Sequence, residues 1–189
     1  MTHRPPLSEL EETVVWHGEK IVLRPITGSD EAQHAAFVAR LDANDMRMRF
    51  FNARRDLSQT ELARFTHIDY AREMAFIAVR NADGAAPETL GVVRAVMAAD
   101  GGETELAIAV RSDVKHDGLG HALMLKMIAY LKHCGVRRVV CDVLRENAGM
   151  RELAHSHGFV VDASLYEADT MRLVLTLASD TEPVSSSGH

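Results

Sequence analysis

The sequence predicts an α/β fold of the α+β type, in which a mixed, mostly antiparallel twisted sheet of six to seven strands is flanked by about four helices. Three observations predict it. Short apolar or alternating runs, typical of strands, are interleaved with amphipathic helical patterns. Three consecutive strand patterns in the middle of the chain are separated by turn residues, which predicts an antiparallel meander. A strand, a helix and a strand then follow in order, which predicts a crossover connection.

In the first half, residues 20–25 (KIVLRP) predict a strand that ends at a proline. Ser29 and Asp30 can cap a helix that continues to Leu41. Ser58, with a glutamate three residues later, forms a capping box at the start of a second helix. The meander strands are predicted at 74–80, 89–98 and 103–111, and Asp-Gly sequences lie in the two turns between them.

In the second half, residues 118–134 predict the longest helix, which is apolar on one face and stopped by Gly135. Residues 137–144 (RRVVCDVL) have the nearly continuous apolar middle of a central buried strand. A second amphipathic helix is predicted at 147–157, and two further strands at 159–161 and 170–177 close the chain.

The chain is predicted to contain one domain. Its 189 residues, nearly half of them apolar, suit a single globular unit. Residues 1–17 carry two prolines and an acidic cluster and are expected to form a flexible arm. Residues 178–189 are polar and are expected to form a disordered tail, which leaves residues 18–177 as the domain.

Composition excludes several classes of protein. The net charge of −6 argues against a nucleic-acid partner. Two cysteines, Cys134 and Cys141, are too few for a disulfide scaffold, and neither has a neighbouring base that would make it a nucleophile. The N-terminus lacks an apolar signal core, and no apolar run reaches membrane-spanning length. A cytoplasmic protein without membrane contact is therefore expected.

The stretch SDVKHDGLGHALM, residues 112–124, predicts a phosphate site. It connects a strand to the longest helix and contains Gly118 and Gly120. Glycines allow main-chain N–H groups to turn toward one point, and a helix start adds unpaired donors and positive dipole charge. Lys115 would add a mobile positive charge. The alternative is a tight turn without a ligand, because short glycine motifs have many false positives.

Residues 115–120, Lys-His-Asp-Gly-Leu-Gly, resemble the Arg/Gln-x-x-Gly-x-Gly/Ala loop of the GNAT acetyltransferase superfamily. The order of elements is similar too, as is Asn147 followed by Gly158-Phe159 at the end of the next helix. The resemblance covers residues 20–177. The stretches MRMRFF, ELARFTHIDYAREMAFIAV, ETLGVVR, IAVRSDVK and DVLREN are similar to the GNAT domain of bacterial Pat-type protein lysine acetyltransferases. The resemblance implies the GNAT fold.

The resemblance implies acetyl-CoA as cosubstrate and assigns roles to individual residues. The pyrophosphate would bind at Lys115, His116, Asp117, Gly118, Leu119, Gly120 and His121. The pantetheine arm would bind main-chain groups of Ile108, Ala109 and Val110, on a strand that splays from its neighbour, and the side chain of Asn147. Asn147 could equally be a helix N-cap. An N–H near Ala109 would polarise the thioester carbonyl.

Glu105 lies ten residues before Lys115 and matches the general-base glutamate of protein-acetylating members. Partial burial beside alanines would raise its pKa, which suits a base that accepts a proton from an amine. Glu103, on the same face, is the alternative base. A solvated edge glutamate without a catalytic role is the other interpretation.

The sequence departs from the family at two positions. Lys115 replaces the usual arginine or glutamine, which keeps the charge but loses the planar fork. Ala154 stands where many members have a tyrosine that protonates the leaving thiolate. The thiolate would then take its proton from water, from the incoming amine, from Tyr70 or from Tyr166. The thiol pKa of about 8.5 makes an acid helpful but not essential.

The resemblance implies transfer of an acetyl group to an amine. The predicted acceptor is a protein lysine, for example on an acyl-CoA synthetase. The alternatives are a small amine such as a polyamine or an antibiotic, and a non-catalytic acetyl-CoA sensor. No metal is expected, because the histidines lack ligand spacing. The basic residues Arg47, Arg49, Arg54 and Arg55 either contact an acidic protein surface or form a solvated loop. The sequence is compatible with a monomer and with a dimer.

Overall fold

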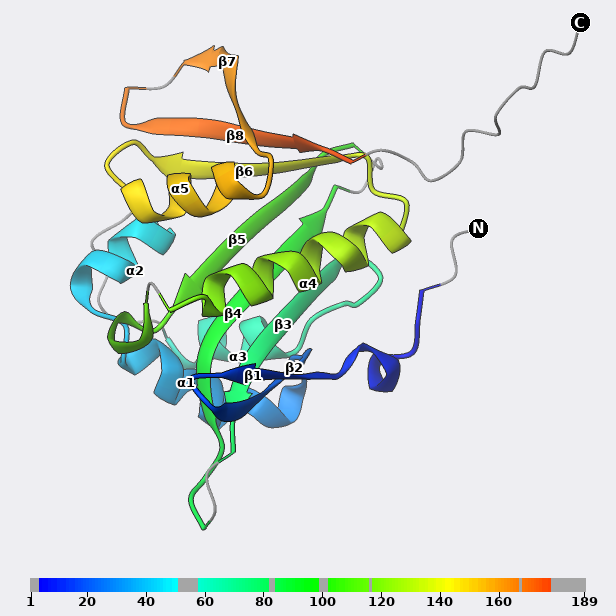
Figure 1. Cartoon of the computed structure of the whole chain (residues 1–189), viewed down its shortest axis with the longest axis vertical. Coiled ribbons are helices and arrows are strands. Elements are labelled where there is room, and N and C mark those ends of the chain that lie inside the picture. The colour runs from blue at the N-terminus through cyan, green and yellow to red at the C-terminus, as the bar shows by residue number, and fades with distance from the viewer. Residues whose placement is uncertain are drawn as a thin grey trace, which may run out of the picture.

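The computed structural model describes residues 4–50, 58–81, 84–98, 102–115, 117–166 and 168–177. These residues form five α-helices and eight strands (Figure 1). The strands are β1 (Glu12–Trp16), β2 (Glu19–Pro25), β3 (Glu73–Arg80), β4 (Glu88–Met97), β5 (Thr104–Val110), β6 (Arg138–Leu144), β7 (Val160–Tyr166) and β8 (Thr170–Thr176). The helices are α1 (Glu31–Ala39), α2 (Ala43–Phe50), α3 (Gln59–Thr66), α4 (Leu119–His133) and α5 (Ala148–Ser156).

All eight strands belong to one sheet, in the order β1-β2-β3-β4-β5-β6-β8-β7. Every neighbouring pair is antiparallel except β5 and β6, which are parallel and connected through α4. A parallel pair requires such a crossover, whereas the antiparallel meander β2 to β5 does not. The predicted fold class is confirmed, with more strands than expected.

Helices cover both faces of the sheet, and strand β3 shows why its sequence is continuously apolar. Met74, Phe76 and Ala78 point to the face where α4 and α5 pack, in a core that includes Leu123 and Ala154. The residues between them, Ala75, Ile77 and Val79, point to the face where Phe37 of α1 and Met46 of α2 pack. Because side chains alternate along a strand, both sets must be apolar. Helix α4 crosses the sheet on the first face (Figure 1).

The expected flexible arm over residues 1–17 is wrong in part, because Glu12–Trp16 forms strand β1 and pairs with β2. The turn between these strands is the two residues His17 and Gly18, both with positive φ, of 49° and 80°. Two positive φ values match the right-handed twist of a hairpin. The signal was the His-Gly pair between the apolar runs 14–16 and 21–23.

Helix α2 was also missed, because its second half, from Met46 on, was interpreted as part of a basic loop. The Asp42 carboxylate accepts a hydrogen bond from the Asp45 main-chain N–H at 2.7 Å, which satisfies one of the free donors at the helix start. Met46 then anchors the helix in the core. Arg54, Arg55 and the predicted tail over 178–189 lie outside the described residues. Within those residues, no helix has the length and apolarity to cross a membrane.

Candidate active site

The sheet opens between β5 and β6. Strand β5 pairs with β4 along its whole length, from Thr104 to Val110. With β6 it pairs only at Thr104 and Glu105, opposite Val139 and Val140. The two strands diverge beyond these pairs, so the splay that the family resemblance implied is present. The later main-chain groups of β5 on this side face a gap rather than a neighbouring strand.

The pairing with β4 identifies which main-chain groups face this gap. The Arg111 N–H donates to the Leu90 carbonyl at 2.9 Å. The Ala109 carbonyl oxygen also points to β4, because it lies 3.2 Å from where a Cβ of Gly91 would be. Since main-chain groups alternate along a strand, those of Ile108 and Val110 face the gap. The expected donor near Ala109 is therefore the N–H of one of its two neighbours.

A cavity of about 660 Å³ occupies the gap, which is within the usual size range of small-molecule sites. Strands β5 and β6, the start of α4, helix α2 and helix α5 form its walls. The predicted site residues that line it are Glu105, Ile108, Ala109, Val110, Lys115, Gly118, Gly120, His121 and Asn147. Five stretches of the chain thus bring the predicted base and the predicted phosphate loop into one cavity.

Three predicted phosphate-loop residues are not among the described lining. Leu119 is 1% exposed and its side chain belongs to the core, where it anchors the first turn of α4. Asp117 faces β1: its carbonyl accepts from the Trp16 indole N–H at 2.7 Å, and its carboxylate lies 3.7 Å from His17 Nε2. Neither side chain lines the cavity, so phosphate binding by the main-chain groups of these two residues stays the prediction. His116 lies outside the described residues.

The start of α4 has the geometry expected for an anion site. Gly118 precedes the helix with a φ of +86°, a conformation that L residues with a Cβ adopt with strain. At Gly120, an added Cβ would lie 3.4 Å from Leu153, so the main chain is exposed to the cavity without a side chain between them. The first N–H groups of the helix lack intrahelical partners and can bind phosphate oxygens.

Lys115 does not extend freely beside this helix start. Its ammonium group forms an ion pair with the carboxylate of Asp45, on α2. Asp45 is 7% exposed and also accepts a hydrogen bond from the Ser112 hydroxyl. The prediction that the Lys115 ammonium group is mobile is wrong, because the buried carboxylate of Asp45 holds it in place. Sequence reasoning missed Asp45 because it missed helix α2.

The two candidate bases on β5 differ clearly. Glu105 is exposed and lines the cavity. Glu103 forms ion pairs with Arg138, at 2.7 Å, and Arg172, at 3.2 Å, on the neighbouring strands β6 and β8. Glu103 therefore connects strands, and Glu105 is the carboxylate available to a ligand. The partial burial predicted for Glu105 is wrong, because its side chain is exposed.

Arg49 on α2 lies beside Glu105 in the cavity wall. Burial and the nearby Arg94 guanidinium lower the pKa of Arg49 to about 10, and the Glu105 carboxylate acts in the opposite direction. Arg49 is still cationic at neutral pH. Its side chain was expected either to contact an acidic protein surface or to lie in a solvated loop, but the structure places it in the cavity wall.

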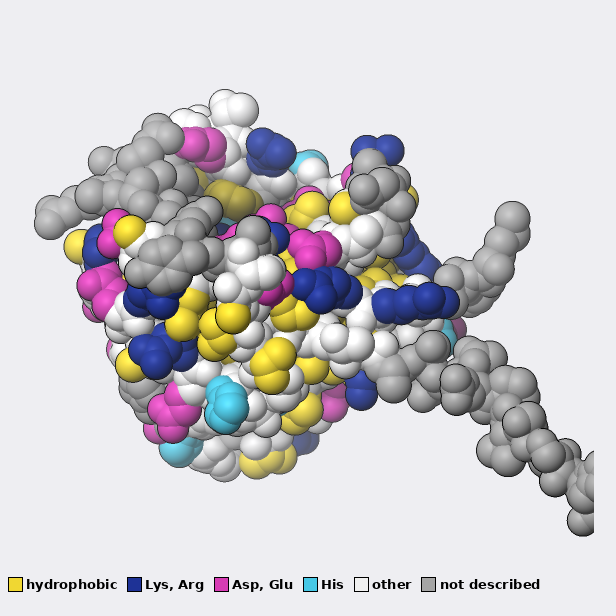
Figure 2. All heavy atoms as spheres, turned by 90° about the horizontal axis from the view of Figure 1, so that it is seen from above, with side chains coloured by type: hydrophobic (Ala, Val, Ile, Leu, Met, Phe, Trp, Pro, Cys, Tyr) yellow, Lys and Arg dark blue, Asp and Glu magenta, His cyan; other side chains and the backbone are white. Residues whose placement is uncertain are grey.

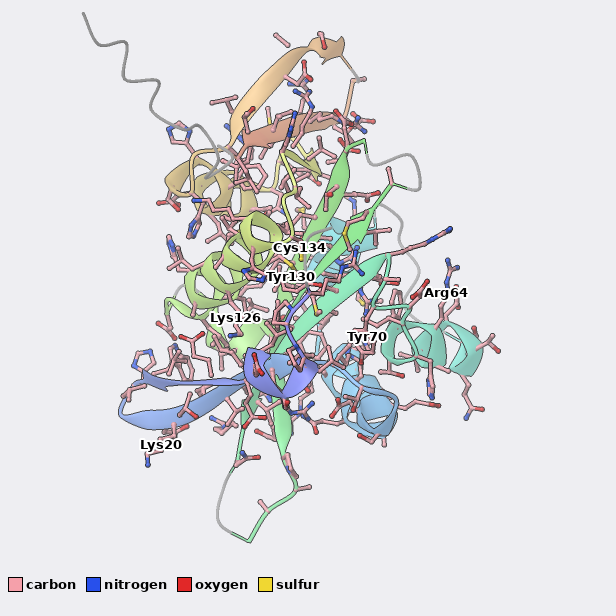
Figure 3. The ribbon with its side chains drawn as sticks, turned by 90° about the vertical axis from the view of Figure 1, so that its right-hand side faces the viewer. Lys20, Arg64, Tyr70, Lys126, Tyr130 and Cys134 are labelled. Carbon is pink, nitrogen blue, oxygen red and sulfur yellow. The ribbon has the colours of Figure 1, made fainter. Side chains whose placement is uncertain are left out.

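The other candidate groups are constrained by their neighbours. The Asn147 side chain accepts from the Met150 N–H at 3.0 Å, so it caps α5 and lines the cavity at once. Tyr70, near α3 in Figure 3, donates its hydroxyl to the Ile26 carbonyl and is not in the described lining, so it cannot replace the missing tyrosine in this state. The side chain of Tyr166, the other tyrosine considered, lies outside the described part of the chain.

Cys141 lines the cavity but is unsuited to covalent catalysis. Burial and the adjacent Asp142 carboxylate raise the pKa of its thiol to about 12, so it stays protonated. Cys134 lies beside Tyr130 on α4, away from the cavity (Figure 3). Across the described ranges, no group of three or more metal-ligating side chains is present.

Comparisons with known proteins agree with this geometry. The model of the acetyltransferase (GNAT) domain matches residues 20–160. The acetyltransferase PA5475 of Pseudomonas aeruginosa is 29% identical over 143 residues, which is 76% of each chain. The crystal structure of the GNAT domain of S. lividans PAT superimposes with a TM-score of 0.81 at 26% identity, covering 92% of this chain and all of that one.

A more distant structure shares the fold and contains bound CoA. It is the spermidine N-acetyltransferase of Vibrio cholerae in complex with CoA and spermine, with a TM-score of 0.66 at 18% identity. The match covers 82% of this chain and 95% of that one. The sheet opening, the glycine-flanked start of α4 and the match over 20–160 together lead to one conclusion: this chain belongs to the GNAT family of N-acetyltransferases.

Proposed function

We propose that this GNAT acetyltransferase transfers the acetyl group of acetyl-CoA to a protein lysine ε-amine, for example on an acyl-CoA synthetase. The observation that carries the proposal is that Glu105 lines the same cavity as the splayed part of β5 and the start of α4. The strand and the diphosphate site would thus bind acetyl-CoA in the same cavity in which the base meets the acceptor amine. The similarity to the GNAT domain of S. lividans PAT, at 26% identity over 92% of this chain, supports a protein acceptor.

In this proposal, the start of α4 binds the diphosphate and the gap beside β5 binds the pantetheine arm. Main-chain N–H groups after Gly118 meet the phosphate oxygens, and Lys115 adds positive charge at the edge. Ile108 and Val110 offer main-chain hydrogen bonds to the amides of the arm. These contacts hold the thioester where the strands separate, near Glu105.

Glu105 prepares the acceptor. A lysine amine has a pKa of about 10.4 and is almost entirely protonated at pH 7, so it must lose a proton before it attacks. The Glu105 carboxylate accepts that proton, directly or through a water molecule. The amine nitrogen then forms a bond to the thioester carbon, and the carbonyl oxygen becomes an oxyanion that accepts a hydrogen bond from a β5 main-chain N–H facing the gap.

Collapse of this intermediate breaks the C–S bond. The sulfur takes a proton from water or from the amine nitrogen, which must lose its second proton to become an amide. Ala154 is fully buried and cannot contribute, and the Cys141 thiol, with its raised pKa, is a weak acid. Because the CoA thiol has a pKa of about 8.5, it leaves as a thiolate without a strong acid.

The test is an acetylation assay with labelled acetyl-CoA and three kinds of acceptor: a purified acyl-CoA synthetase, lysine peptides and polyamines. We expect label on the synthetase and the peptides, at lysine side chains identified by mass spectrometry. Label on polyamines alone would reject the protein acceptor in favour of a small amine. CoA binding without label on any amine would reject catalysis in favour of acetyl-CoA sensing.

A further inference from the structure

An ion pair crosses the mouth of the cavity. The Arg47 guanidinium of α2 binds the carboxylate of Glu146, in the loop between β6 and α5. The two side chains are 45% and 51% exposed, and they are 99 residues apart in the chain. Glu146 is part of the cavity lining, and so are Asn44 and Met48 of α2. The pair therefore joins two walls of the site at its solvent-facing edge.

Glu105 and Glu146 lie at different ends of the cavity wall that β6 forms. Glu105 pairs with Val140 of β6, and the strand continues to Leu144 before the turn that carries Glu146. Four residues of extended strand span about 13 Å. A ligand that reaches both carboxylates would need two separate groups, one at the reacting end and one at the rim.

The carboxylate of Glu146 can change partners easily. Two other acidic residues of the lining are held more firmly: Asp142 forms two hydrogen bonds of 2.8 Å with Arg172, and buried Asp45 holds Lys115. The Arg47–Glu146 pair is half exposed on both sides, and such pairs contribute little free energy. A cation from another molecule could replace Arg47 at little cost.

We propose that Glu146 binds a positive charge that the acceptor carries beside its reacting amine, and that Arg47 occupies this carboxylate until the acceptor arrives. Arg47 acts as an internal substitute for the ligand, so it is a competitor of the acceptor rather than a contact for an acidic surface. This inference rests on the proposed N-acetyltransferase function and narrows its substrate class. The acceptor is a lysine with a second cation several residues away.

The spacing identifies the peptide that should react best. In an extended peptide, side chains four residues apart are separated by about 13 Å, the same span that β6 has from Val140, beside Glu105, to Leu144, just before the turn with Glu146. We therefore expect a lysine followed or preceded by arginine at about four residues to be preferred over the same peptide with glutamine there. Spermidine, whose amines are closer together, tests whether any second cation suffices.

The experiment measures kcat and KM for the arginine and glutamine peptides with three variants. Glu146→Gln removes the carboxylate, and we expect a rise in KM for the arginine peptide of about threefold, with kcat unchanged. Arg47→Gln removes the competitor, and we expect KM for the same peptide to fall about threefold. Neither substitution should change KM for the glutamine peptide.

Arg40→Gln is the matched control, because Arg40 also forms an exposed ion pair, with Glu88 at 2.9 Å, and is not in the described cavity lining. It should leave both KM values unchanged. A merely structural bridge would make Arg47→Gln and Glu146→Gln change activity in the same direction for both peptides, and that result would overturn the inference. Equal KM values for the two peptides with the wild-type protein would overturn it too.

The result separates the inference from the function on which it rests. If both peptides are acetylated without preference, acetyl transfer to lysine stands and the role of Glu146 fails. If neither peptide is acetylated although the protein binds CoA, the proposed lysine acceptor fails, and the inference fails with it. Acetylated spermidine with unmodified peptides would assign the second cation to a polyamine and reject a peptide spacing.

Discussion

Lys115, in the loop before α4, forms an ion pair with Asp45 of α2. The pair connects the proposed diphosphate site to the helix that flanks the proposed acceptor side. Basic and acidic side chains lie next to one another over much of the surface in Figure 2, and here the same mixing occurs inside a binding site. Asp45 reduces the positive potential that a bound diphosphate would experience from Lys115.

We therefore expect Asp45→Asn to strengthen CoA binding by about three- to tenfold, because the charge of Lys115 is then no longer neutralised. The loss of a buried ion-pair partner should lower the free energy of unfolding by about 1 kcal/mol. Isothermal titration with CoA and urea denaturation measure the two effects. Lys115→Gln is the comparison and should weaken CoA binding. Weaker binding by Asp45→Asn as well would mean that Asp45 orients Lys115 for the phosphates.

Glu105 and Glu103 offer a matched pair on the same face of β5. Glu105→Gln removes the proposed base, and we expect kcat to fall by about 10² to 10⁴-fold while the dissociation constant of CoA is unchanged. Glu103→Gln breaks contacts with Arg138 and Arg172, so it should affect stability more than kcat. Steady-state kinetics and CoA titration of both variants decide which of the two glutamates is the base. A loss of turnover in Glu103→Gln but not in Glu105→Gln would reverse the assignment.

The glycines at the start of α4 have different roles and should respond differently to substitution. Gly118→Ala places a Cβ at a φ of +86° and should lower the free energy of unfolding by about 1 kcal/mol, while Gly118→Asn should cost less because asparagine tolerates this conformation.

Gly120→Val should leave the fold intact and abolish CoA binding, because its methyl groups would enter the cavity beside Leu153. Thermal melting and CoA titration test both. Retained CoA affinity in Gly120→Val would place the phosphates elsewhere.

Much of the fold could be predicted from the sequence where local signals and packing agree. The run 74–80 and the meander predicted the centre of the sheet, and the capping box at Ser58 and Glu61 is present, with a hydrogen bond of 2.8 Å from the Ser58 N–H. Strand β1 and helix α2 were missed because prolines and arginines suggested irregular chain. Tertiary contacts stabilise both: β1 pairs with β2, and Met46 fills the core.

The site was predicted less completely, for a physical reason. The glycine loop is a local feature, so Gly118 and Gly120 could be found from sequence, whereas Glu105 was assigned from its match to the general-base position of the family it resembles. The partners Asp45, Arg49 and Glu146 come from elements distant in the chain, and only the opening of β5 from β6 brings them to the same cavity. Ion pairs between distant elements leave no periodic signal in a single sequence.

His34 on α1 predicts how stability depends on pH. It is 4% exposed, and its Nδ1 has no hydrogen-bond partner among the described residues. Burial, with the nearby Arg94 guanidinium, lowers the pKa of His34 to about 4. The pKa of an unfolded histidine is about 6.5, so between pH 6.5 and 4 the unfolded chain binds a proton that the folded protein excludes. The contribution of neutral His34 to the free energy of unfolding is therefore complete above pH 6.5 and is lost as the pH falls from 6.5 to 4.

His34→Leu removes this dependence. We expect the free energy of unfolding of the wild-type protein to fall by about 2 kcal/mol relative to the variant between pH 7.5 and pH 5, since each pKa unit corresponds to about 1.36 kcal/mol. Urea denaturation of both proteins at the two pH values measures the difference, and His155→Gln, exposed on α5, controls for the loss of one imidazole. If His34→Leu and the wild-type protein lose stability in parallel, His34 is protonated in the folded protein and a group outside the described contacts stabilises its charge.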